Sequence, residues 1–126
     1  MTRVPIAGVG MTKFGAQGER TSRDLFAEAA SKAYDDSGLS PEDVDEVFYG
    51  NYMGELAEQQ GHSGPLVAEA AGVTAPATRI ESACASSGAA VRHGANRIRN
   101  GDVDVVLVGG AERMTKLSTA DGTAGL

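Results

Sequence analysis

The sequence predicts an α/β domain whose mainly parallel sheet carries helices on both faces, with the elements in the order β-α-β-α-β-α-β. Short apolar runs alternate with helical patterns along the chain, so that a helical crossover joins each pair of strands. The last run, Val103–Val108, is apolar except for Asp104, which is typical of a strand covered on both faces. With 126 residues and 41% hydrophobic content, the chain is long enough to form one core.

The first half of the chain contains two predicted strands and one long helix. The apolar run Val4–Val9 predicts a buried strand that ends in a glycine-containing turn. A helix is predicted over Ser22–Ser37, because Thr21 or Ser22 can cap its start and apolar residues recur at helical spacing until Gly38. Val44–Tyr49 then predicts the second strand.

The second half begins with the polar stretch Gly54–Ser63, for which no regular element is predicted. A helix is expected over Pro65–Ala71, and the alternating segment Arg79–Ala83 predicts a short strand. The next helix, Ala85–Ile98, stops at Asn100-Gly101. Its predicted contact face consists of Gly88, Val91, Ala95 and Ile98.

Cys84, the only cysteine, lies between the predicted strand and the small-residue helix that follows. A thiol at a helix N-terminus forms the reactive thiolate more readily, because the first backbone N–H groups carry partial positive charge. The small residues after Cys84 let an acyl chain, a cofactor arm or another helix approach the backbone. Cys84 is therefore a candidate nucleophile, although a lone cysteine is more often a small buried apolar residue.

A cysteine nucleophile needs a base, and the chain has two histidines. His93 lies nine residues after Cys84 on the predicted helix, about 13.5 Å along the axis and on the opposite side. This spacing excludes direct contact. His62 precedes a helix, where a solvated loop histidine is the more common interpretation.

Four segments carry a resemblance to a known family. The cysteine segment Glu81–Ala90 resembles the nucleophile segment of the thiolase superfamily. Val4–Thr12 and Val47–Asn51 resemble the first two strands of that family, and Val108–Met114 its Gly-Gly-x-Glu-x-Met motif. Their order and spacing agree, and the resemblance covers nearly the whole chain. It is closest to the acetyl-CoA acetyltransferases of the sterol-carrier-protein-type and archaeal branch, and only to their N-terminal portion.

The resemblance implies a thiolase N-terminal α/β domain over residues 1–114 and the start of a truncated loop region over residues 115–126. It implies acyl transfer between CoA thioesters, with Cys84 as the acyl-accepting residue, acyl-CoA and CoA as substrates and no bound cofactor. The family's catalytic histidine and second cysteine lie in a C-terminal half, and the sequence has no Gly-His-Pro or Cys-x-Gly motif. A homo-oligomer or a complementing C-terminal half is therefore the expected partner. Two alternatives remain, a non-catalytic assembly or dimerisation module of the same fold and a redox-sensing thiol protein.

Composition excludes several other classes. The net charge of −6 and the pI near 4.8 argue against nucleic-acid binding, which requires a clustered basic face. No apolar run approaches the roughly 20 residues of a membrane span, and no signal peptide is recognisable. One cysteine allows neither an intrachain disulfide nor a cysteine-rich metal site, so no metal is expected. The expected location is the cytoplasm.

Overall fold

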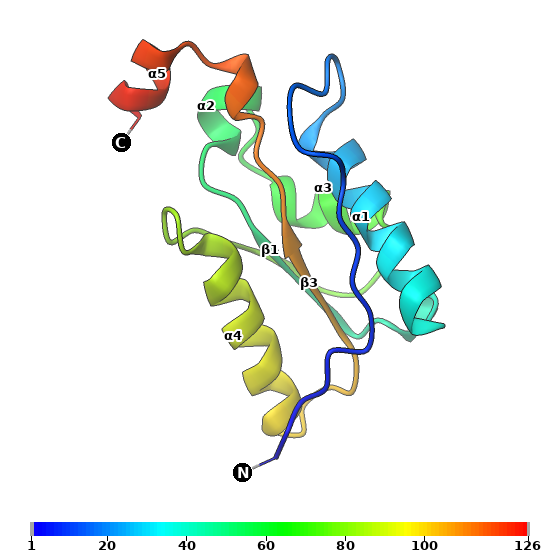
Figure 1. Cartoon of the computed structure of the whole chain (residues 1–126). Coiled ribbons are helices and arrows are strands. Elements are labelled where there is room, and N and C mark those ends of the chain that lie inside the picture. The colour runs from blue at the N-terminus through cyan, green and yellow to red at the C-terminus, as the bar shows by residue number, and fades with distance from the viewer. Residues whose placement is uncertain (1, 126) are drawn as a thin grey trace.

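The computed structural model describes residues 2–125 as one three-stranded parallel sheet with helices around it (Figure 1). The strand order is β2-β1-β3, so β1 lies in the centre and pairs with both neighbours. The strands are β1 (Glu46–Gly50), β2 (Ala77–Ile80) and β3 (Val106–Gly110). The α-helices are α1 (Ser22–Ser37), α2 (Gly54–Glu58), α3 (Ser63–Ala70), α4 (Ser86–Arg99) and α5 (Thr119–Ala124), and the short 3-10 helices are η1 (Pro41–Asp43) and η2 (Met114–Lys116).

Helices cover both faces of the sheet, which confirms the predicted α/β class. Figure 1 shows α4 on one side of β1 and β3, with α1 and α3 on the other side. Side chains of β1 alternate between these layers, as the period of two requires. Val47 and Tyr49 are fully buried in the core formed with α1 and α3. Phe48 points the other way, and its ring centroid lies 5.9 Å from that of His93 on α4.

The prediction of a first strand over Val4–Val9 is wrong. These residues belong to no strand, and the segment instead runs in extended form beside α1 (Figure 1). The backbone N–H of Val9 donates to the Asp36 carboxylate at 2.9 Å, and no ladder hydrogen bond joins the segment to β3. Ile6 is 81% exposed and Val9 67%. An apolar run becomes a strand only when a neighbouring strand pairs with it, and this segment forms no ladder with β3, whose outer edge stays unpaired within residues 2–125.

The predicted contact face of α4 also needs correction. The residues of α4 that are buried are Ser86, Ala90 and Gly94, whereas Val91 is 51% exposed. Gly94 packs directly on β3, where an added Cβ would meet Val108 Cγ1 at 2.7 Å. The apolar stripe found in the sequence thus lies beside the face that meets the sheet.

Two short helices occur where none was predicted. α2 forms within the polar stretch after β1, and α5 forms within residues 115–126, the segment that the resemblance assigns to the start of the loop region. α3 begins at Ser63, two residues before the predicted start at Pro65. β1 and β3 begin two and three residues later than predicted, at Glu46 and Val106.

Within residues 2–125, no helix combines the length and the apolar character that crossing a membrane requires.

Candidate active site

The carboxyl ends of the three parallel strands lie at one edge of the sheet, and each leads into a segment with polar side chains. β1 leads into Asn51, β2 leads through residues 81–85 into α4, and β3 leads into Glu112. Ligands of α/β sheets bind at this edge, because loops and helix N-termini converge there. Cys84 lies in the second of these connections and is exposed.

A tight turn carries Cys84 from β2 to α4. Ala83 adopts a left-handed conformation with φ of 49°, which a residue with a Cβ rarely takes. The buried Ser86 stabilises this turn with two hydrogen bonds. Its hydroxyl donates to the Ala83 carbonyl oxygen at 2.7 Å and accepts from the Ser82 N–H at 2.9 Å. The turn reverses the chain around Cys84 and leaves its side chain accessible to solvent.

The helix starts slightly later than the sequence predicted. Ala85 is the N-cap of α4 and Ser86 its first helical residue, so Cys84 lies one residue before the cap. No side chain caps the helix at Ala85, which leaves its positive end directed toward the turn. β2 ends at Ile80, three residues before the predicted strand end at Ala83, so residues 81–85 connect the strand to α4 and only Ala85 lies between Cys84 and the helix.

Two strand-end glycines allow α4 to approach the sheet at this point. A Cβ on Gly50 would lie 2.6 Å from the backbone nitrogen of Ser87 and 2.7 Å from its Cα. At Gly110 a Cβ would overlap the Gly50 carbonyl oxygen and the Ser87 hydroxyl. The first turn of α4, and with it the Cys84 turn, is therefore seated directly on the ends of β1 and β3.

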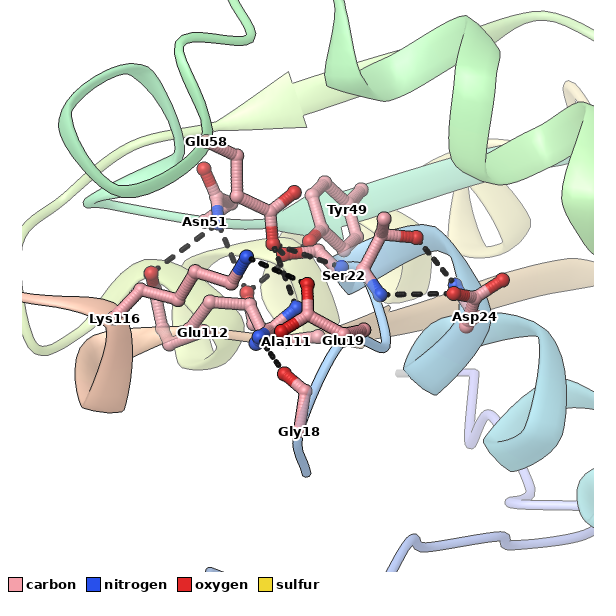
Figure 2. Close-up of polar contacts among 12 residues, drawn as sticks. Gly18, Glu19, Ser22, Asp24, Tyr49, Asn51, Glu58, Ala111, Glu112 and Lys116 are labelled. Carbon is pink, nitrogen blue, oxygen red and sulfur yellow. Dashed lines mark hydrogen bonds and ion pairs between the residues drawn. The ribbon is translucent and has the colours of Figure 1, made fainter. Parts of the chain in front are cut away.

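The connection after β1 is held by Asn51 and Glu112, as Figure 2 shows. Asn51 is 1% exposed, and its side-chain amide donates to the Ala111 carbonyl oxygen at 2.9 Å and to Glu112 Oε2 at 3.3 Å. The Glu112 carboxylate also accepts the backbone N–H groups of Tyr52 and Met53. These groups fix the loop between β1 and α2. Burial raises the pKa of the nearby Tyr49 phenol, which stays protonated and donates to the Ala111 carbonyl oxygen at 3.1 Å.

The sequence did not indicate the roles of Ser86 and Glu112. Ser86 sits in a run of small residues in which no periodicity distinguishes it. Glu112 belongs to the Gly-Gly-x-Glu-x-Met motif, which marked the position but not its contacts. The motif was the one signal that could have pointed to it.

Among residues 2–125, neither histidine forms a hydrogen bond with the Cys84 thiol. His93 packs against Phe48 in the middle of α4. The predicted spacing from Cys84 had excluded it only as a direct partner of the thiol. His62 is exposed at the N-cap of α3, and its backbone N–H donates to Gln60. Among residues 2–125, no three His, Cys, Asp or Glu side chains are grouped closely enough to hold a metal ion.

Comparison with known proteins identifies the family. The family model described as "Thiolase, N-terminal domain" matches residues 4–125. The chain belongs to the thiolase family. An acetyl-CoA acetyltransferase of Methanocaldococcus jannaschii is 44% identical over 121 residues, which cover 95% of this chain and 31% of that protein. One from Methanothermobacter thermautotrophicus is 40% identical over 116 residues, 91% of this chain and 30% of that protein.

A solved structure agrees with the fold of this thiolase domain. The Acat5 thiolase of Ascaris suum in complex with coenzyme A superposes with a TM-score of 0.72 at 21% identity, over 86% of this chain and 28% of that one. The family model and the two acetyl-CoA acetyltransferases confirm the predicted thiolase superfamily, N-terminal portion. The chain spans a little under a third of the length of the curated relatives it matches.

Proposed function

We propose that this chain is the nucleophile-bearing part of a thiolase-type acyltransferase that works on CoA thioesters. The observation that carries the proposal is the Cys84 turn, which presents an exposed thiol at the carboxyl edge of the sheet in front of the uncapped N-terminus of α4. The relatives named acetyl-CoA acetyltransferases support acyl-CoA and CoA as substrates.

In the proposed reaction, the Cys84 thiolate attacks the carbonyl carbon of an acyl-CoA thioester. A bond forms between Cys84 Sγ and that carbon, the bond to the CoA sulfur breaks, and CoA leaves as a thiolate that takes up a proton. The acyl group then passes to the α-carbon of a second acyl-CoA, which first loses a proton to a base, or back to the sulfur of CoA. In either case the bond between Cys84 Sγ and the acyl carbon breaks, and the Cys84 thiolate is released. The backbone N–H of Cys84 can stabilise the oxyanion of the tetrahedral intermediate, since it lies in front of the positive end of α4.

We further propose that full catalysis requires a complementing C-terminal half or a further subunit, because general acid and base groups contribute typically 10²–10⁴-fold and neither histidine is hydrogen-bonded to Cys84. An apolar groove of about 600 Å³ supports this proposal. One wall is the extended segment 4–10, the other is residues 104–108 of the β3 edge, and α1 and α4 line the rest. Val9 and Ile6 remain largely exposed there, so a partner segment would bury apolar surface.

Isotope exchange tests the covalent step without requiring the second half. The chain is mixed with acetyl-CoA and labelled CoA, and label entering acetyl-CoA is followed. We expect exchange that Cys84→Ser abolishes, since the hydroxyl keeps the shape of the side chain but not the thiolate. Absence of exchange would contradict the proposal. If alkylation of Cys84 remained rapid in that case, the redox-sensing alternative would be favoured.

Steady thiolysis of acetoacetyl-CoA and light scattering test the need for a partner. The chain alone is expected to show no steady turnover, and to self-associate or to bind a hydrophobic dye through the apolar groove. Steady turnover by a clean monomer would contradict this part. If the chain self-associates or binds the dye but shows no isotope exchange, the assembly-module alternative would be favoured.

A further inference from the structure

A second, smaller hollow of about 240 Å³ opens on the α1 and α3 side of the sheet, where β1 ends. Cys84 leads into α4, which covers the opposite face, so this hollow is separate from the Cys84 turn. α1 and α3 both begin at its wall, at Ser22 and Ser63, and η2 closes it from the side of β3. Figure 2 shows several of its polar residues, including Ser22, Tyr49, Glu58 and Lys116.

Two buried polar atoms at this hollow have no hydrogen-bond partner among the described residues. Arg113 is 3% exposed: one guanidinium N–H donates to the Gly18 carbonyl oxygen at 2.7 Å, but its Nε–H is unpaired. Ser63 is 6% exposed, and its hydroxyl is also unpaired. Leaving a buried polar group unsatisfied destabilises the folded state, and more so when the group is charged. Both groups can donate a hydrogen bond, and both line the same hollow.

The charges around the hollow favour an anion. Its lining contains three cationic side chains, Arg23, Arg113 and Lys116, and one anionic side chain, Glu58. Lys116 also lies 3.9 Å from the exposed Glu19 carboxylate, so Arg23 and Arg113 account for the excess of positive charge over Glu58. Glu58 Oε1 already accepts the Ser22 N–H at 2.9 Å and the Ser22 hydroxyl at 2.7 Å, and it lies 3.9 Å from an Arg113 nitrogen. The start of α3 adds partial positive charge beside the unpaired Ser63 hydroxyl.

We infer that this hollow binds a small oxyanion, a phosphate or a carboxylate group, between the Arg113 Nε–H and the Ser63 hydroxyl. Such an anion accepts from both unpaired donors and neutralises the excess of positive charge. The outward-facing Arg23 and Lys116 stand at the entrance, where they attract an anion from solvent. Tyr49 and Asn51 do not take part, since the Tyr49 hydroxyl donates to the Ala111 carbonyl oxygen and the Asn51 amide donates to that oxygen and to Glu112 Oε2.

Thermal unfolding and titration calorimetry of the 126-residue chain test this site. The probes are sodium phosphate, sodium sulfate and sodium acetate, each against sodium chloride at equal ionic strength, which removes general screening. We expect one of the oxyanions to raise the Tm beyond the chloride control, because binding to the folded state stabilises it. A preference for phosphate or for acetate identifies which of the two groups the site takes.

Variants locate the binding. Ser63→Ala and Arg23→Ala are each expected to weaken binding of the preferred anion roughly tenfold, as the loss of a hydrogen bond or an ion pair to a charged ligand predicts. Arg92→Ala is the matched control, because Arg92 is an exposed cation on α4, away from the hollow. No stabilisation beyond chloride, or an equal effect in Ser63→Ala and the unmodified chain, would overturn the inference.

Discussion

Removing the Ser86 hydroxyl should loosen the Cys84 turn. In Ser86→Ala the Ser82 N–H loses its acceptor, and the Ala83 carbonyl oxygen keeps only the 3.2 Å bond from the Ser86 N–H. Each lost hydrogen bond contributes about 0.5–1.5 kcal/mol, so the pair contributes about 1–3 kcal/mol. The left-handed Ala83 costs about 1–2 kcal/mol more than a right-handed residue, and the Ser86 bonds offset that strain. Without them the turn is expected to relax.

Two assays measure the effect. Denaturant unfolding should show a loss of about 2 kcal/mol in the free energy of unfolding. Iodoacetamide labelling follows the thiol directly, because Cys84 is the only cysteine, and its rate is expected to fall when the turn no longer fixes Cys84 before α4. Ser31→Ala is the control, an exposed serine on α1 whose side chain forms no hydrogen bond with any of residues 2–125. A Ser86→Ala variant with unchanged stability and an unchanged labelling rate would refute this reasoning.

Three further changes test the surroundings of the turn. Gly50→Ala places a Cβ against the backbone of α4 and should lower the free energy of unfolding by about 3 kcal/mol; a loss below about 1 kcal/mol would contradict the close packing. Glu112→Gln keeps the shape but weakens acceptance of two loop N–H groups, so proteolysis within residues 52–60 should accelerate, and unchanged protection would argue against this role. The N–H groups of Val105 and Asp104 hold the pKa of Asp45 below its ordinary value of 3.8, so its stabilising contribution is present above that value and lost as the pH falls through the lowered pKa. Asp45→Asn should therefore be less stable than the unmodified chain at neutral pH and approach it in acid, and a difference independent of pH would contradict this.

The elements predicted correctly are those whose signals are local. α1 has its cap, its apolar stripe and its terminal glycine within one short stretch, and the structure forms the predicted boundaries, with Thr21 and Asp24 capping each other and Gly38 at φ of 75°. The strand predicted at Val4–Val9 failed because strand formation depends on a partner that no local pattern reveals.

In the candidate site, too, the sequence predicted the local features and missed those that depend on the fold. The sequence located Cys84 between a strand and a helix, but it gave no sign that Ala83 would be left-handed, since alanine does not favour that conformation. Nor could spacing show that Glu112 binds N–H groups some 60 residues earlier in the chain, because the parallel sheet brings the two strand ends together. The resemblance to thiolases marked the residue, and only the fold gave its contacts.

The intact mass of the chain after incubation with acetyl-CoA tests the central claim, that Cys84 accepts an acyl group. We predict one acetyl group per chain, located on Cys84 by peptide mapping, removed by added CoA and absent from Cys84→Ser. A folded chain whose Cys84 reacts with iodoacetamide but takes up no acetyl group, or carries it only on lysines, would contradict the account.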